Sequence, residues 1–233
     1  MVDPGDAAPV IAHLDREGLE LCAILTTHHH NDHVGGNRAL LARSPVPVFG
    51  PARETIPGRT HALAEGNAFT VPGVGIELSV LDIPGHTAGH IAYVARDASA
   101  PLVFCGDTLF AVGCGRLFEG TPPQMLASLA KLAALPGPTR VYCGHEYTLA
   151  NLRFARAVEP ANALLKKRQA REQEKRDREQ PTLPSTIGDE RETNPFLRSD
   201  EPAIRAAAER HADRALSDSV AVFAEIRAWK NAF

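Results

Sequence analysis

Residues 26–33 read Thr26-Thr27-His28-His29-His30-Asn31-Asp32-His33, and this stretch decides the fold. The apolar run 21–25 precedes it and predicts a buried strand of ordinary length. The segment 34–43 follows it and predicts a helix. The histidines and the aspartate therefore occupy a loop between a strand and a helix. Such loops on a rigid scaffold are where functional side chains gather.

The spacing within this loop indicates two metal ions. His28 and His30 are two residues apart, so their side chains leave an extended backbone on the same side. Asp32 and His33 are adjacent, and their side chains diverge. We therefore expect the first pair on one ion and the second pair on another, and these ligand types suit zinc, iron or manganese. A histidine-rich tract can also be a solvated loop, so the rest of the chain must supply the missing ligands.

Three later residues meet that requirement. His86, Asp107 and His145 each stand beside or just after a glycine, immediately beyond a predicted strand. The three strands are 75–83, 102–105 and 140–143. Loops at one edge of a sheet collect a site from distant parts of the chain. The alternative is that each is an ordinary loop residue, but their shared context favours a two-metal site.

The composition excludes several other classes of protein. A chain of 233 residues with a net charge of −3 lacks the basic footprint of a nucleic-acid-binding protein. We find no run of about 18 apolar residues for a membrane span, and no signal peptide. The four cysteines form no Cys-x-x-Cys pair and read as buried thiols in a reducing compartment. We expect a cytoplasmic protein without nucleic-acid or membrane partners.

The chain changes character near residue 148. Before it, predicted strands alternate with loops; the strand 46–50 is expected near a sheet edge because of Pro47, and 59–67 is expected to be a polar loop. After it, helical patterns take over and no strand is predicted. The expected helices are 149–158, 161–179, 201–210 and 216–229. The charged run 166–179 reads as a solvated helical face. We therefore expect two domains, 1–147 and 148–233.

Several short motifs together resemble a known family. They are THHHNDH at 27–33, PGHTAGH at 84–90, FCGDTLF at 104–110, GCGRLFEG at 113–120, YCGHEYT at 142–148, and TNPFLR at 193–198. The first specifies only the metallo-β-lactamase superfamily, and the set resembles its glyoxalase II (hydroxyacylglutathione hydrolase) family. The resemblance implies an α/β fold, an αββα sandwich, followed by a small α-helical C-terminal domain. The family has two strands before the turn at 2–5, so we expect this sandwich to lack its first strands.

The resemblance also implies roles for particular residues. His28, His30 and His86 would bind one metal; Asp32, His33 and His145 would bind the other; Asp107 would bridge them. Arg116, Phe118, Tyr147, Arg227 and Lys230 would line the glutathione site. Phe118 stands where well-known members carry tyrosine, and Arg116 where some carry lysine. Arg227 and Lys230 share a helical face and suit a carboxylate, although composition alone would favour a solvated basic pair.

The implied activity is hydrolysis of S-D-lactoylglutathione to glutathione and a 2-hydroxy acid, the second step of methylglyoxal detoxification. A hydroxide held by two divalent ions, zinc first and iron or manganese as alternatives, would attack the thioester. A thiolate leaving group needs little acid assistance, and no Gly-x-Ser-x-Gly elbow suggests a protein nucleophile. We expect a monomer. Three other classes share some of these features: an exported β-lactamase, a mononuclear iron persulfide dioxygenase acting on glutathione persulfide, and a non-catalytic metal-binding protein. The complete second ligand set favours the hydrolase.

Overall fold

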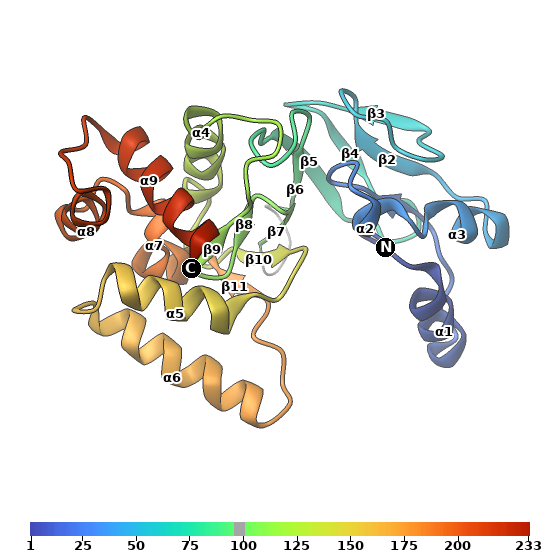
Figure 1. Ribbon diagram of the computed structural model, residues 1–233. Coiled ribbons are helices and arrows are strands. Elements are labelled where there is room, and N and C mark those ends of the chain that lie inside the picture. Colours follow the sequence, from blue (N-terminus) through green and yellow to red (C-terminus); the bar gives the residue numbers. More distant parts are fainter. Residues whose placement is uncertain (96–100) are drawn as a thin grey trace.

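Two sheets packed face to face form the centre of the computed structural model, which describes residues 1–95 and 101–233 (Figure 1). Helices cover the outer face of each sheet, which gives four layers in the order helix, sheet, sheet, helix. The helices that follow β10 gather on the side of the larger sheet that lies away from the amino-terminal helices (Figure 1). This is the αββα arrangement expected from the sequence, with helices at its C-terminal end.

The smaller sheet is parallel and has the strand order β1-β2-β3. Its strands are β1 (Ile24–Leu25), β2 (Val48–Pro51) and β3 (His61–Leu63). Val2 adds an isolated parallel bridge to Leu25. Two predictions are wrong here. The strand after Pro47 lies in the middle of the sheet, because the proline precedes the paired residues, and the expected loop 59–67 contains β3.

The larger sheet has six strands in the order β11-β10-β7-β6-β5-β4. They are β4 (Ala68–Thr70), β5 (Glu77–Asp82), β6 (Ile91–Ala95), β7 (Leu102–Gly106), β10 (Arg140–Cys143) and β11 (Ser185–Thr186). Only the pair β7–β10 is parallel. The strand predicted at 75–83 is confirmed as β5, which pairs antiparallel with β4. A separate short hairpin joins β8 (Leu109–Phe110) to β9 (Gly113–Cys114).

Strand β6 shows how the layers pack. Every residue of β6 is buried, because both of its faces are covered. Ile91 and Tyr93 point into the core between the sheets, whereas Ala92 and Val94 point into the core beneath the outer helices. This alternation is the period-two pattern of a strand. Burial of both faces makes this strand the rigid centre of the scaffold.

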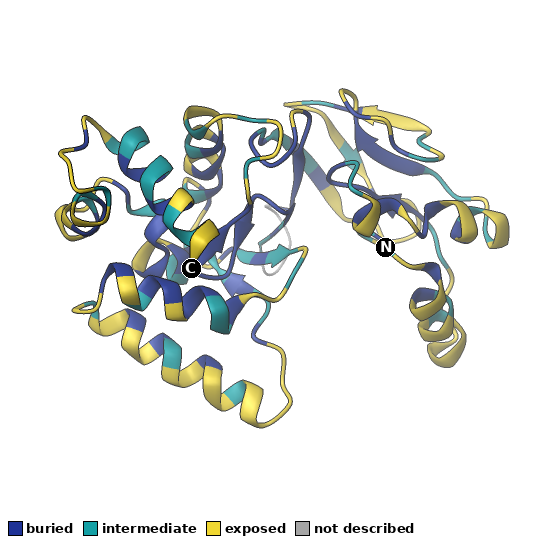
Figure 2. Ribbon diagram, viewed as in Figure 1, coloured by how far each residue is buried: buried dark blue, intermediate teal, exposed yellow. Residues whose placement is uncertain are grey.

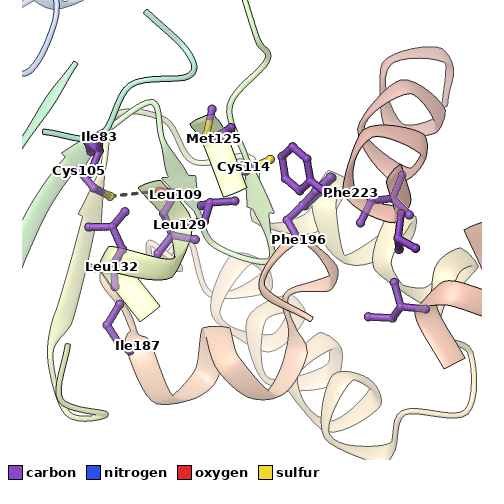
Figure 3. Close-up of a cluster of buried hydrophobic side chains, with 14 of the residues drawn as sticks. Ile83, Cys105, Leu109, Cys114, Met125, Leu129, Leu132, Ile187, Phe196 and Phe223 are labelled. Carbon is purple, nitrogen blue, oxygen red and sulfur yellow. Dashed lines mark hydrogen bonds between the residues drawn. The ribbon is translucent and has the colours of Figure 1, made fainter. Parts of the chain in front are cut away.

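Helix α4 (Pro122–Ala133) covers the outer face of the larger sheet. It begins at Thr121 in a capping box with Gln124, as the Thr-Pro-Pro sequence predicts. Its buried stripe includes Met125, Leu129 and Leu132. Figure 3 shows this stripe in one cluster with residues of the sheet and of the C-terminal helices. That cluster joins the two parts of the chain through one continuous core.

The smaller sheet is covered by α1 (Ala7–Glu17), α2 (Asn31–Val34) and α3 (Asn37–Arg43). The first ends at Gly18, whose φ is +62°. The single helix predicted at 34–43 is divided in two. The backbone at Gly35 and Gly36 lies against the amino-terminal turn: a Cβ on Gly35 would sit 2.6 Å from the Gly5 carbonyl oxygen, and Gly36 N donates to Pro4 O at 2.8 Å.

The C-terminal part is mainly helical. It contains α5 (Thr148–Val158), α6 (Ala163–Asp177), α7 (Ile187–Thr193), a 3₁₀ turn (Pro195–Leu197), α8 (Pro202–Ala212) and α9 (Ser219–Ala232). Two predictions are wrong. A strand, β11, pairs antiparallel with β10, although none was expected after residue 148. The charged helix is also not wholly solvated: most of α6 is exposed (Figure 2), but Arg168 and Glu172 are buried against its neighbours. No helix among the described residues is both long and apolar enough to cross a membrane.

Candidate metal centre

Strands β5, β7 and β10 run in the same direction, and this brings the predicted ligands to one edge of the sandwich. Strands β5 and β7 both run antiparallel to β6, and β10 runs parallel to β7. The carboxyl ends of these three strands therefore meet at the same edge. His86, Asp107 and His145 follow those ends, and the loop 26–33 arrives from β1 of the facing sheet. The structure thus brings together side chains that are more than a hundred residues apart.

The first group consists of His28, His30 and His86, whose ligand atoms all lie within 4.8 Å of one another. Nε2 of His86 is 3.0 Å from Nδ1 of His30. Nδ1 of His86 donates to the carbonyl oxygen of Arg116 at 2.8 Å, which orients Nε2 toward the group. His28 and His86 are buried, and His30 is half-buried.

The second group consists of Asp32, His33 and His145. Nε2 of His145 lies 3.3 Å from Nε2 of His33 and 3.3 Å from Oδ2 of Asp32. Asp32 is exposed, whereas His33 is buried. The adjacency of the two residues in sequence does not prevent them from facing one point, because they occupy the first turn of α2. The expected divergence of their side chains is therefore wrong, and their binding of one shared ion stays a prediction.

Asp107 contacts both groups. Its Oδ1 lies 3.3 Å from Nε2 of His33, and its Oδ2 lies 3.5 Å from Nε2 of His86 and 3.4 Å from Nε2 of His145. Each carboxylate oxygen thus faces a histidine of the second group, and one of them also faces the first. A carboxylate in this position can join two cations.

These residues fit metal ions. Two nitrogen ligands at ~2.0–2.1 Å from a tetrahedral zinc lie about 3.3 Å apart, and the contacts above are close to that separation. Two buried atoms, Nε2 of His28 and Oδ1 of Asp107, have no hydrogen-bond partner among the described residues. Buried polar atoms are ordinarily paired. The lack of a partner for these two atoms is explained if each of them is a metal ligand.

The electrostatics of the two groups differ. Burial lowers the pKa of His28 and of His86. Burial also opposes the charge on His33, but contacts with Asp107 and Asp3 outweigh it and raise the pKa of His33 to about 10. The hydrogen bond to Asp107 raises the pKa of His145. Burial opposes ionisation of Asp107 itself, yet these same histidines lower the pKa of its carboxyl group.

His90 supports Asp107 from below. Its Nε2 accepts the backbone N–H of Asp107 at 3.1 Å, its Nδ1 donates to the carbonyl oxygen of Ile91 at 3.1 Å, and its ring stacks on His28 at 4.5 Å. Burial lowers the pKa of His90 to about 3, so the ring is neutral at physiological pH. These contacts both orient the backbone of Asp107 and pack the ring of His28.

Asp3 supports His33 and was not anticipated. Its carboxylate accepts the backbone N–H and the hydroxyl of Thr27, both at 2.7 Å, and lies 3.2 Å from Nδ1 of His33. The sequence carries no local signal of this role, because it depends on contacts with residues 24 and 30 positions away. The backbone of Asp3 is left-handed (φ +47°), and these contacts compensate that conformation.

A pocket of about 570 Å³ opens above the two groups. All five residues expected at the glutathione site line it: Arg116, Phe118, Tyr147, Arg227 and Lys230. Phe118 is 63% exposed and faces His86 edge-on at 5.2 Å, whereas Tyr147 stacks on His145 at 5.2 Å. One aromatic ring thus contacts a ligand of the first group, and the other contacts a ligand of the second group.

The basic residues differ in their surroundings. Arg227 is buried, donates to the carbonyl oxygen of Cys114 at 2.7 Å and lies over the ring of Phe196. Lys230 is half-buried, one turn further along α9, and lies over the ring of Phe154. Burial, and then the neighbouring arginines, lower the pKa of Lys230. Helix α9 therefore brings concentrated positive charge to one wall of the pocket.

Comparison with known proteins covers the whole chain. The family model described as the metallo-beta-lactamase superfamily matches residues 1–145, and the one described as the hydroxyacylglutathione hydrolase C-terminus matches residues 146–233. The chain belongs to the hydroxyacylglutathione hydrolase family. The expected fold and family are therefore confirmed.

Individual relatives agree with this membership. A hydroxyacylglutathione hydrolase from Alkalilimnicola ehrlichii is 61% identical over 231 residues, which are 99% of this chain and 89% of that protein. Another from Cupriavidus taiwanensis is 59% identical and covers 100% of this chain and 90% of that protein. Among solved structures, TTHA1623 in a di-iron-bound form has a TM-score of 0.57 and 30% identity, over 84% of this chain and 87% of that chain. Family membership and the two clusters together support binding of divalent metal.

Proposed function

We propose that this member of the hydroxyacylglutathione hydrolase family hydrolyses S-D-lactoylglutathione to glutathione and a 2-hydroxy acid. The observation that carries the proposal is the position of Asp107. Its two oxygens contact histidines of both ligand groups, and these groups form one end of a pocket whose α9 wall is cationic. The names of the relatives support the same substrate class.

We propose two divalent ions, with zinc first and iron or manganese as alternatives. His28, His30 and His86 would hold one, Asp32, His33 and His145 would hold the other, and Asp107 would be shared. When bound by these residues, such ions would lower the pKa of a bound water and polarise a carbonyl group. The mixed nitrogen and oxygen donor set and the di-iron form of a 30% identical protein support this count.

The protein's own side chains would hold and orient the substrate. Glutathione carries two carboxylates, and Arg227, Lys230 and Arg116 offer the charges to bind them. Phe118 would provide an apolar face beside the reacting group, because it has no hydroxyl to donate. The departing thiol has a pKa near ~8.5, so no protein acid is required. We assign no residue as a nucleophile.

The proposal extends to the organisation of the molecule. Residues 1–147 would form the catalytic domain, and residues 148–233 would bind the substrate. We propose a cytoplasmic monomer that acts on a small molecule and binds neither nucleic acid nor membrane. The net charge of −3 supports the first of these exclusions. Size-exclusion chromatography with light scattering would test the monomer directly.

One comparison of substrates tests the proposed function. The purified protein is given S-D-lactoylglutathione while thiol release is followed, and glutathione persulfide while oxygen consumption is followed. We expect thiol release without oxygen consumption, together with two equivalents of metal by elemental analysis. Oxygen consumption with one equivalent of iron would instead favour the persulfide dioxygenase, which the family membership does not favour.

A further inference from the structure

His29 is the histidine of the 26–33 stretch that belongs to neither ligand group described above. Its ring lies between two carboxylates and meets the ring of His30 edge-on, with 5.0 Å between the ring centres. Nδ1 of His29 is 3.0 Å from Oε2 of Glu54, and Nε2 is 3.3 Å from Oε1 of Glu119. Because His28 and His30 flank it in the chain, any restraint on His29 also restrains the backbone that carries two ligands.

Glu54 lies in the segment between β2 and β3, and its side chain is only 3% exposed. Its Oε1 accepts hydrogen bonds from the hydroxyl of Thr87 and from the backbone N–H of Gly89, the latter at 3.0 Å. The fit is close, since a Cβ on Gly89 would lie 2.6 Å from Cγ of Glu54. Burying a carboxylate is costly unless it is paired. The partners of Oε1 belong to the loop that carries His86, and Oε2 has only the nearby ring of His29.

Glu119 holds the same loop from the solvent side. Its Oε2 accepts the backbone N–H of Ala88 at 2.7 Å, while its Oε1 faces His29. Two carboxylates from separate segments thus join the loop 86–90 to the loop 26–33. The three ligands of the first group, His28, His30 and His86, come from these two loops and from nowhere else.

We propose that Glu54 is a positioning residue for the first metal group. Through Thr87, Gly89 and His29, it fixes the separation between the two loops that supply the group, and Glu119 completes the clamp. The inference rests on the proposed function only for the statement that this group holds a metal. Residues that orient ligands in this way typically change metal affinity by ~10–100-fold when they are removed.

The test compares Glu54→Ala and Glu54→Gln with Glu77→Ala, an exposed glutamate on β5. The affinity for Zn²⁺ is measured by competition with a chromophoric chelator, without substrate. We expect Glu54→Ala to weaken one of the two zinc sites by about 10–100-fold. Glu54→Gln keeps an acceptor for Thr87 and Gly89 and should lose less. Glu77→Ala should bind like the unaltered protein.

Kinetics supply a second, independent readout. Glu54 does not line the pocket among the described residues, so turnover in limiting zinc should fall while KM stays within about twofold. Excess zinc should refill the weakened site of the Glu54→Ala variant and so restore its turnover. If that variant does not fold, as judged by circular dichroism, Thr87→Val and Glu119→Ala replace it, because each removes one contact of the clamp and both are expected to weaken the same zinc site.

The possible outcomes are distinct. The proposed clamp would be wrong if well-folded variants weakened both zinc sites equally. It would also be wrong if they weakened neither site. A rise in KM with unchanged zinc affinity would also overturn it. If the unaltered protein binds zinc yet does not hydrolyse S-D-lactoylglutathione, the proposed function fails, but the affinities still decide the role of Glu54.

Discussion

At the residue scale, the carboxylate of Asp107 divides the histidines into two kinds. Those that contact it strongly, His33 and His145, have a raised pKa, which is about 10 for His33. Those governed mainly by burial, His28 and His86, have a lowered pKa. Protons compete with metal for the same ring nitrogens. The two groups should therefore respond differently to acid.

We predict that acid removes metal from the second group first. A raised pKa means that protons displace metal from His33 and His145 while the pH is still comparatively high. A lowered pKa keeps His28 and His86 neutral and available until the pH is lower. Metal content after dialysis at steps between about pH 8 and pH 5, with histidine ring signals followed by NMR, checks the order. Simultaneous release, or release from the first group first, contradicts the prediction.

The pocket's cations give a second prediction at this scale. Lys230→Met should raise KM for glutathione thioesters by roughly ten- to a hundredfold, since a charge-assisted hydrogen bond contributes ~1.5–3 kcal/mol. A thioester without carboxylates should be almost unaffected. Arg227→Met should show the same selectivity and a lower melting temperature, because Arg227 also donates to Cys114 and packs on Phe196. Equal losses on both substrates would show that Arg227 and Lys230 do not bind the glutathione carboxylates.

At the scale of elements, the helical part holds the β8–β9 hairpin through buried polar groups. Glu190 of α7 accepts the backbone N–H of Val112 at 2.8 Å, at a residue with the strained φ of +58°. Asn194 donates to the carbonyl oxygen of Gly113 at 2.9 Å, and Asn151 to that of Ala111 at 3.0 Å. This hairpin carries Phe110 and Cys114 to the pocket, so helices far along the sequence shape its wall.

Glu190 forms a buried ion pair with Arg168 of α6. The two side chains are 0% and 3% exposed and meet at 2.6 Å. We predict that Arg168→Met lowers the free energy of unfolding by ~3–5 kcal/mol, because it leaves a buried carboxylate unpaired. Adding Glu190→Gln should recover part of the loss. Urea unfolding measures both; a loss below about 1 kcal/mol for Arg168→Met would place the pair among ordinary surface contacts.

At the scale of the whole molecule, one core joins the two predicted domains. The cluster that contains Cys105 of the sheet also contains Phe196 and Phe223 of the C-terminal part (Figure 3). Strand β11 adds a further link by pairing with β10. The two parts share their buried apolar surface.

We therefore predict that the chain unfolds in a single transition. Separating the parts would expose the shared core, so neither should remain folded when the other is lost. Urea unfolding followed by tryptophan fluorescence, which reports Trp229, should coincide with unfolding followed by far-ultraviolet circular dichroism. Two resolved midpoints would show that the domains are thermodynamically independent.

Features that depend on residues close together in the sequence were predicted correctly more often than features that depend on distant residues. Ligand motifs and most strands were predictable, because strand periodicity and the residues after each strand are local features. The division of 34–43 was not, because it depends on the approach of Gly36 to Pro4. The burial of Arg168 was hidden for a similar reason: its partner, Glu190, is 22 residues away.

The most direct test of the central claim titrates metal-free protein with zinc while S-D-lactoylglutathione hydrolysis is followed. The account predicts activity that rises to a plateau at two equivalents. Asp107→Ala should lose far more turnover than His90→Ala, which leaves every ligand in place and should cost no more than ~10–100-fold. A plateau at one equivalent, or near-normal turnover by Asp107→Ala with full metal content, would contradict a two-metal site joined by Asp107.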